Sequence, residues 1–329
     1  MKGGKEKMER KSYAGLVFFL CLCLTLFFCE GNVFSAKFPE KPVKFIVAFS
    51  PGAGIDLEAR GLVPYLQKYL GVSTTIENIP GADGKIGLTK AWRANPNGYT
   101  LAIHTTTMTL LGEILLNPEY RVADFSHIYS WSLSNTVLVV HSEKWKTFDE
   151  LVQDARQRPV SVGMAGRGSS THLNSIILWH GLGIKVNWVP YDGAGNALTA
   201  LAGGHIDVVA AATTSALTLV KAGKIRPLLV LANSKDMVFP DVPLAKDLGY
   251  KHTFVSMIRG ADGPPKMGVG VIKVLEEAFA KAVKDPGYIQ WAERRMMEII
   301  PLNSAEYGKM IETQQKEIEK FRDLLKTGS

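Results

Sequence analysis

Short apolar runs rich in β-branched residues alternate with amphipathic stretches from residue 43 almost to the end of the chain. The run Val43–Phe49 is nearly continuous, which is typical of a strand buried on both faces. It leads into Ser50–Gly54, a cluster of serine, proline and glycine that interrupts regular structure. From Asp56 onward, apolar residues return at helical spacing until Gly71. This repeated order of strand, loop and helix predicts an α/β fold with mostly parallel sheets flanked by helices.

Two further features refine this prediction. The chain has 329 residues, a length that suggests two lobes, and it contains no low-complexity linker between them. Pro64 interrupts the first helical pattern, so we expect a kink there or a helix that begins later. From Lys266 to Lys326 the pattern is mostly helical. The remaining strands are expected at Thr74–Glu77, Thr100–His104, Thr136–His141, Val160–Met164, Lys185–Val189, Ile206–Ala211, Arg226–Leu231 and His252–Ile258.

The first 36 residues differ from the rest. Basic residues between Lys2 and Lys11 precede an apolar run, Ala14–Phe28, and the small residues Ser35 and Ala36 follow it. This order predicts a secretory signal peptide over residues 1–36, cleaved near Ser35 or Ala36. The alternative is an uncleaved anchor, but the run is shorter than the roughly 20 residues that span a bilayer. We therefore expect a soluble periplasmic protein.

Removal of this segment changes what the chain can do. All three cysteines lie within it, so the mature protein would have no disulfide, no thiolate nucleophile and no cysteine-ligated metal. The segment holds five basic and three acidic residues, so the net charge falls from +7 to +5. This mild excess favours anionic solutes. Nucleic acid is not expected as a partner, because no basic run is interleaved with aromatic residues.

Loops rich in glycine and hydroxyl groups follow many of the predicted strands. In open parallel sheets, ligands bind beside the carboxyl ends of strands. Glycine allows close approach of the backbone, and the N–H groups at the start of a helix favour an anion. Each loop alone is more typical of turns and helix caps than of a site, but the six loops together predict a site. These loops are Ser50–Asp56, Pro80–Gly84, Thr105–Thr107, Gly166–Thr171, Asp192–Gly195 and Thr213–Ser215.

Enzyme motifs are incomplete in this sequence. Gly52 and Gly54 follow a strand as in a dinucleotide fingerprint, but Leu57 replaces the third glycine. There is no Walker A motif, no G-x-S-x-G elbow and no histidine pair with metal-ligand spacing. His172, close to Ser169, is expected to pack or cap within its helix rather than act as a base. Asp56 is expected to be a helix cap. We therefore predict no catalytic residue, no metal and no cofactor.

Seven segments follow one another in an order typical of one family. They read FPEKPVKFIV, ENIPGADGKIG, NGYTL, GRGSSTHL, VPYDG, LAGGHID and FPDVP, at 38–47, 77–87, 97–101, 166–173, 189–193, 201–207 and 239–243. Together they resemble the tripartite tricarboxylate transporter receptors, the Bug-type periplasmic binding proteins. The resemblance covers essentially the whole chain after the signal peptide.

This resemblance implies a class II periplasmic binding protein, a Venus flytrap of two lobes. Lobe 1 would comprise residues 37–134 plus 251–329, and lobe 2 residues 135–250. Family members bind di- and tricarboxylates, acidic amino acids or aromatic carboxylates, and deliver them to large and small membrane permease subunits. The loop after the first strand holds one carboxylate in the family, partly through ordered waters. We expect ligand contacts from Ser50, Ala53, Gly54, Ile55, Asp56, His104, Thr105, Thr106, Arg167, Gly168, Ser169, Ser170, Thr171, Tyr191 and Thr213.

The chain departs from the family pattern in three places. Ile55 stands where the family has a threonine, and Arg167 precedes the glycine-serine pair in place of a small residue. The stretch Ser256–Pro265 replaces an aromatic residue and a proline-alanine-glycine turn. Arg167 is either a clamp for a second acidic group or a solvent-exposed loop residue. The sequence does not decide whether Arg167 and Arg259 face the cleft.

The sequence thus predicts a monomeric extracytoplasmic receptor that captures a small carboxylate-bearing solute for a membrane permease. The main alternative is a secreted α/β enzyme acting on a small anionic substrate. A binding lobe that reports to a membrane sensor is a further alternative. The sequence does not identify the ligand.

Overall fold

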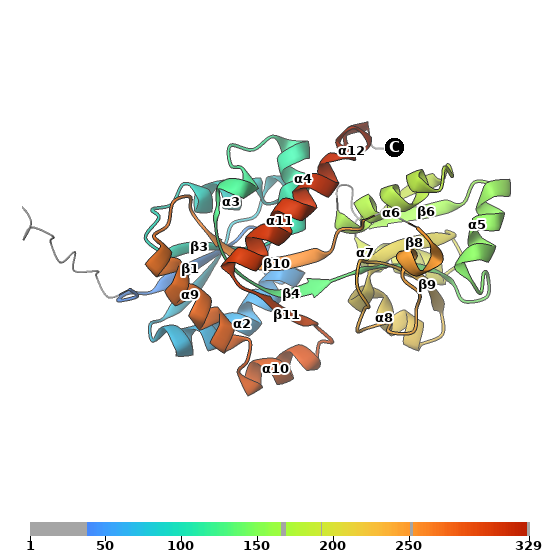
Figure 1. Cartoon of the computed structure of the whole chain (residues 1–329). Helices are drawn as coiled ribbons and strands as arrows, with labels where there is room; N and C mark the ends of the chain where they lie inside the picture. The colour runs from blue at the N-terminus through green and yellow to red at the C-terminus, as the bar shows by residue number, and fades with distance from the viewer. Residues whose placement is uncertain (1–37, 166–168, 192, 251–252, 328–329) are drawn as a thin grey trace, which may run out of the picture. The chain divides into compact units, whose positions relative to one another are not determined.

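The structure is a computed structural model that describes residues 38–165, 169–191, 193–250 and 253–327 (Figure 1). Residues Pro39–Ser329 form one compact unit. The expected signal peptide lies outside the described residues, as do Arg167 and Gly168. Within the described ranges, no helix has the length and apolar character needed to cross a membrane.

The first sheet has six strands in the order β11-β4-β10-β3-β1-β2. Successive residues of β1 point to opposite faces, and both faces are covered. Phe45 packs edge-on against Phe279, while Ile46 joins a buried cluster with Leu88 and Leu110. The strands are β1 (Val43–Val47), β2 (Thr74–Asn78), β3 (Thr100–Thr105), β4 (Ser126–Ser134), β10 (Met257–Gly263) and β11 (Ile299–Leu302). The helices of this part are α2 (Gly54–Leu70), α3 (Lys85–Trp92), α4 (Thr106–Leu116), α9 (Val269–Ala282), α10 (Pro286–Glu293), α11 (Ser304–Glu319) and α12 (Arg322–Thr327).

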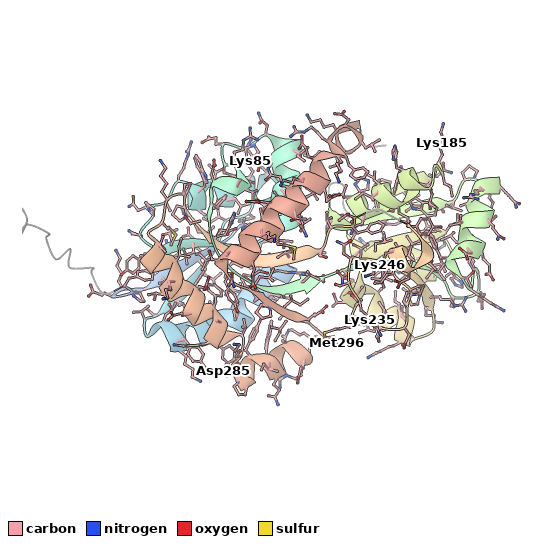
Figure 2. The ribbon with its side chains drawn as sticks, viewed as in Figure 1. Lys85, Lys185, Lys235, Lys246, Asp285 and Met296 are labelled. Atoms are coloured by element: carbon pink, nitrogen blue, oxygen red, sulfur yellow. The ribbon has the colours of Figure 1, made fainter. Side chains whose placement is uncertain are left out.

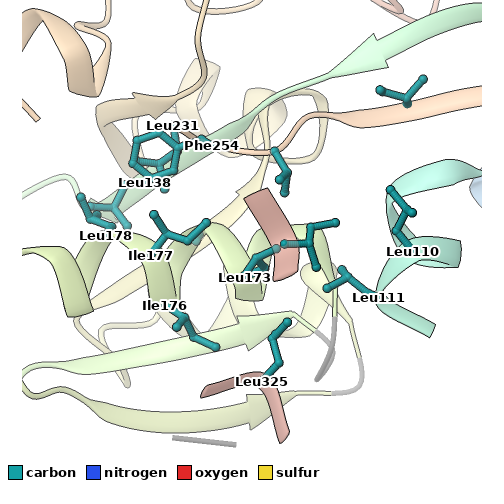
Figure 3. Close-up of a cluster of buried hydrophobic side chains, with 14 of the residues drawn as sticks. Leu110, Leu111, Leu138, Leu173, Ile176, Ile177, Leu178, Leu231, Phe254 and Leu325 are labelled. Carbon is teal, nitrogen blue, oxygen red and sulfur yellow. The ribbon is translucent and has the colours of Figure 1, made fainter. Parts of the chain in front are cut away.

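The second sheet has five strands in the order β7-β6-β8-β5-β9. It too is covered on both faces. Val137 of β5 belongs to a cluster with Leu198 and Leu217, whereas its neighbour Leu138 packs in the cluster that contains Leu173 (Figure 3). The strands are β5 (Thr136–His141), β6 (Ser161–Ala165), β7 (Asn187–Tyr191), β8 (Val208–Ala212) and β9 (Ile225–Leu231). The helices are α5 (Phe148–Gln157), α6 (Ser170–Gly181), α7 (Ala194–Ala202) and α8 (Thr213–Lys221).

Both sheets are mixed, which corrects the expectation of mostly parallel strands. The β1–β2, β1–β3, β6–β7 and β6–β8 pairings are parallel, and the other five pairings are antiparallel. The physical reason lies in the chain crossings. Only Asn135 separates β4 from β5, so the chain passes directly from one sheet to the other. The strands that carry the chain from the first sheet to the second and back are therefore antiparallel to their neighbours.

Buried side-chain amides connect the two segments that cross between the sheets, one at Asn135 and the other at Val255 and Ser256. Asn135 Nδ2 donates to Asp236 Oδ2 at 3.0 Å, and Asn135 Oδ1 accepts from Ser256 Oγ at 3.0 Å. Asn174 of α6 donates to the Val255 carbonyl oxygen at 2.8 Å and accepts from the Val255 N–H at 2.9 Å. Because these groups have no access to water, their mutual hydrogen bonds fix the paths of both crossing segments.

Several expected elements differ in position from the observed ones. The strand expected at His252–Ile258 begins at Met257 and continues to Gly263, through residues with low strand propensity. Strands β4 and β11 were not expected, because β4 places serines in the core and β11 is short. Helix α2 starts at Gly54 and runs through Pro64, so the alternative of a later start is wrong. Pro64 is exposed, so the carbonyl that loses its partner lies on the solvent side of the helix.

Candidate functional site

Two of the predicted loops lie where the two sheets adjoin the crossing segments. In the first sheet, Thr105 pairs with Arg259 and Ser134 pairs with Met257, so the end of β3 adjoins both crossings. In the second sheet, Thr136 pairs with Ala212 and with Leu231. The starts of α4 and α8 follow directly from these strand ends. The topology therefore brings the loops Thr105–Thr107 and Thr213–Ser215 to the junction of the sheets.

Helix α2 begins without a side-chain cap. Its N-cap is Ala53, whose N–H donates to the Ser50 carbonyl oxygen at 3.1 Å. The N–H groups of the first turn, which includes Gly54 and Ile55, have no partner within the helix itself. They carry the positive end of the helix dipole. Helices α4, α7 and α8 likewise begin without a side-chain cap among the described residues.

Asp56 organises the loop before α2, rather than capping the helix as expected. One oxygen accepts from the Gly52 N–H at 2.8 Å and from Arg60 Nε at 2.9 Å, and the other from Asn78 Nδ2 at 2.8 Å. The side chain is buried. Burial alone would raise the pKa of Asp56, but the hydrogen bonds from Arg60, Gly52 and Asn78 outweigh it and lower the pKa. Asp56 thus stays ionised and holds the shape of the loop.

The residues after β3 are held by protein groups. The hydroxyl of Thr106 makes a short hydrogen bond with the hydroxyl of Tyr307, and both are buried. The hydroxyl of Thr107 lies 2.6 Å from the Ser256 carbonyl oxygen. Thr105 is the uncapped N-cap of α4 and is also buried. These contacts leave the backbone of this turn, rather than the Thr106 hydroxyl, as the group that can meet a ligand.

His104 is part of a buried network and does not line a cleft. Its Nδ1 lies 2.7 Å from Thr109 Oγ1 and its Nε2 lies 2.5 Å from Asp262 Oδ2. The other Asp262 oxygen is 2.9 Å from His127 Nδ1. Both ring nitrogens of His104 are engaged, so we remove this residue from the expected ligand contacts. Burial alone would raise the pKa of Asp262, but the charge and hydrogen bonds of the two histidines lower it well below its usual range.

The remaining expected residues that the structure describes lie on elements of the second sheet. Ser169 caps α6 by accepting from the His172 N–H at 3.1 Å, and its hydroxyl lies 3.0 Å from Thr171 Oγ1. Ser170 is the first residue of α6 and is buried. Tyr191 ends β7 and is partly exposed. Thr213 begins α8, and its N–H donates to the Asn135 carbonyl oxygen at 3.1 Å.

A cavity of about 170 Å³ joins elements of both sheets. Gly54 from the first turn of α2 and Thr214 from the first turn of α8 line it. Sequence reasoning missed most of its other side chains. Arg259 belongs to the stretch Ser256–Pro265 that departs from the family pattern, but the sequence does not place its side chain in this cavity. Five lining residues are charged or aromatic: Glu58, Arg259, Trp291, Arg295 and Glu298.

The missed residues come from elements without a recognisable motif. Glu58 lies one helical turn after Gly54, and Arg259 lies in β10. Trp291 belongs to α10, and Arg295 and Glu298 belong to the connection between α10 and β11, where Met296 is labelled in Figure 2. No local pattern relates residues 240 positions apart in the chain. Pairing of β10 with β3 and β4 places Arg259 at the start of α2, and pairing of β11 with β4, with Trp291 packed on Gly61 of α2, places the segment from α10 to β11.

Comparison with known proteins agrees with this arrangement. A UPF0065 protein of Agrobacterium vitis is 30% identical over 258 residues, which cover 77% of this chain and 75% of that protein. A TctC solute-binding protein from Polaromonas has a TM-score of 0.77 at 25% identity, covering 86% of this chain and 99% of that chain. MatC from Rhodopseudomonas palustris, solved with bound malate, has a TM-score of 0.69 at 24% identity, covering 88% of this chain and 100% of that chain.

These likenesses confirm the predicted two-lobed α/β fold of periplasmic binding proteins. The model of the family described as "Tripartite tricarboxylate transporter family receptor" matches residues 59–326, most of the chain. The chain therefore belongs to the tripartite tricarboxylate transporter family of solute-binding receptors.

Proposed function

We propose that this protein is an extracytoplasmic receptor that binds a small carboxylate-bearing solute and delivers it to large and small membrane permease subunits. The observation that carries this proposal is the family match over residues 59–326. MatC, a protein of the same fold, was solved with bound malate, a dicarboxylate. The same class of solute is expected here.

The geometry at the sheet junction supports an anionic solute. Uncapped helix starts offer N–H groups and the positive ends of helix dipoles. The start of α2 and the start of α8 line one cavity, so a ligand there would contact elements of both sheets. A ligand that binds both lobes favours the closed state of a two-lobed receptor. The residues proposed for this role are Ser50, Ala53, Gly54, Ile55, Thr105, Ser169, Ser170, Thr171, Tyr191 and Thr213, together with Arg167 and Gly168, which lie outside the described residues.

Further parts of the proposal follow from the family. We assign residues 37–134 plus 251–329 to lobe 1 and residues 135–250 to lobe 2. The protein acts without catalysis, as a monomer, after export and removal of residues 1–36. Amino-terminal sequencing of periplasmic protein should begin near Lys37, and a mature pool that begins at Met1 would contradict export with cleavage.

Titration calorimetry tests the receptor function. The purified mature protein is titrated with succinate, malate, adipate, citrate, butyrate, hexanoate and benzoate. We expect saturable binding of at least one of them at one site per chain, with the solute recovered unchanged. Conversion of a carboxylate to a product would favour the alternative, a secreted enzyme. Uptake of the same solute by cells should require this protein together with both permease subunits.

A further inference from the structure

The cavity at the starts of α2 and α8 contains cationic side chains as well as helix N-terminal turns. Arg259 and Arg295 both line it, and Gly54 and Thr214 represent the two helices. Guanidinium groups bind carboxylates in a planar, two-pronged geometry that an ammonium group cannot match. Whether the cavity can bind a carboxylate therefore depends on which guanidinium N–H groups already donate hydrogen bonds within the protein.

Arg259 is held in place but is not fully engaged. Its Nη1 donates to Ser134 Oγ at 3.1 Å and to the Met257 carbonyl oxygen at 3.2 Å. Its Nε lies 3.1 Å from Glu58 Oε1, and the two side chains are 13% and 14% exposed. This ion pair lacks hydrogen-bond geometry, because the buried Nε has no hydrogen-bond acceptor among the described residues. Nε is buried against Glu58, whereas neither hydrogen bond of Arg259 involves Nη2, so Nη2 is the donor that remains for a ligand.

Glu58 is fixed independently of Arg259. Its Oε2 accepts from Ser132 Oγ at 2.8 Å, inside the first sheet. A buried donor without an acceptor is unusual in a folded protein and is costly unless a ligand or water satisfies it. Glu58 therefore stabilises the charge of Arg259 while leaving Nη2 to another acceptor.

Arg295 adds a second cation to the lining of the cavity. Its guanidinium lies 4.4 Å from the ring centroid of Trp291, and no carboxylate forms an ion pair with it within the described part of the chain. Glu298 also lines the cavity. Burial, and to a lesser degree the charge of Asp236, raises the pKa of Glu298, so its negative charge is less favoured there.

We propose that Arg259 and Arg295 form a subsite for the second acidic group of a dicarboxylate solute, and that Trp291 positions Arg295 by stacking against its guanidinium. This inference rests on the proposed receptor function. The first carboxylate binds the uncapped helix starts, and the second reaches Nη2 of Arg259. The pair Arg259 and Arg295 thereby selects dicarboxylates over monocarboxylates of equal length.

The test uses matched ligand pairs in titration calorimetry: succinate with butyrate, and adipate with hexanoate. Arg259→Lys keeps the charge but removes the guanidinium and with it the Nη2 donor. It should weaken the dicarboxylate of a pair by about ten- to hundredfold, and the monocarboxylate by less than about threefold. Arg295→Gln should weaken the dicarboxylate by about two- to fivefold, since this residue is exposed to solvent.

Two further variants separate recognition from folding. Arg294→Gln removes an exposed neighbouring cation that does not line the cavity and should leave both affinities unchanged. Glu58→Gln removes a negative charge near the approaching carboxylate, so dicarboxylate affinity should rise about two- to tenfold. A purely structural ion pair gives no such gain. This variant also tests the subsite if Arg259→Lys does not fold.

The outcomes distinguish the subsite from the receptor function. If the wild-type protein binds both members of each pair equally, or if Arg259→Lys weakens both equally, the subsite is wrong and the receptor function stands. A failure of Glu58→Gln to strengthen dicarboxylate binding also counts against the subsite. If no carboxylate of the wider panel binds, both the receptor function and the subsite are wrong.

Discussion

Asp262 Oδ2 lies 2.5 Å from His104 Nε2, and neither side chain is exposed to solvent. His127 approaches the other oxygen of the same carboxylate, and the Tyr307 hydroxyl lies 3.4 Å from Oδ2. The network ties β3, β4, β10 and α11 together beneath the first turn of α4. It is therefore a support for the site and not a part of the ligand surface.

Asp262→Asn should destabilise the protein strongly. The change removes a buried charge that two histidines share, which typically costs about 3–5 kcal/mol. The free energy of unfolding from urea titration measures this loss. Asp241→Asn, at an exposed position, is the matched control and should change the value by less than about 0.5 kcal/mol. A loss of similar size in both variants would show that the network does not stabilise the fold.

The same network predicts how stability depends on pH. Burial alone would lower the pKa of His127, but the negative charge of Asp262, its hydrogen bond and the charge of Glu312 raise it. A raised pKa contributes stability that is fully present below about pH 6.5, the value for unfolded histidine. It is lost as the pH rises through the folded-state pKa.

Asp262 acts in the opposite direction. Its lowered pKa contributes stability that is present above about pH 3.9 and is lost as the pH falls further. Together, the two groups predict greatest stability between about pH 4 and 6.5. Urea midpoints measured from pH 4 to 9 should show a decline above pH 6.5 that is smaller in His127→Gln. An equal decline in that variant would mean that other groups cause it.

Two glycines within helices should respond oppositely to alanine. At Gly61 of α2, an added Cβ would overlap the ring of Trp291, so Gly61→Ala should cost about 1–3 kcal/mol. At Gly112 of α4, the nearest atoms are Leu116 Cδ1 at 3.8 Å and the Tyr120 hydroxyl at 3.9 Å, which leaves room for a methyl group. Gly112→Ala should stabilise by about 0.5–1 kcal/mol through helix propensity. Thermal unfolding of the two variants checks both signs, and a stabilised Gly61→Ala would contradict the close packing of Trp291 on α2.

Asn174→Ala should weaken the link between the crossing segments. Asn174 donates to Thr136 Oγ1 at 2.8 Å and forms two hydrogen bonds with the Val255 backbone. Without the amide, buried backbone groups lose their partners, at a cost of about 1–3 kcal/mol. Amide hydrogen exchange at Val255 should accelerate. Asn196→Ala, on the exposed surface of α7, should leave exchange at Val255 unchanged. Unaltered exchange in Asn174→Ala would show that backbone packing alone fixes the crossing.

The sequence by itself determined the class of fold, the covered faces of β1, and the family. These rest on local patterns: apolar runs, helical spacing and the glycine-rich turns that follow strands. The same reasoning placed the loops Ser50–Asp56 and Thr105–Thr107 at one sheet edge. It assigned the wrong role to Asp56, because its partners include Asn78, which is distant in sequence.

Only the tertiary structure decided the direction of the strands and the surroundings of the charged residues. The serines of β4 become core residues because β10 and β11 flank that strand. His104 is buried because β10 places Asp262 beside it, and Arg259 enters the cavity through the same strand. Pairing between segments over 100 residues apart depends on the total burial and hydrogen bonding of the folded chain, and no local window of sequence contains that information.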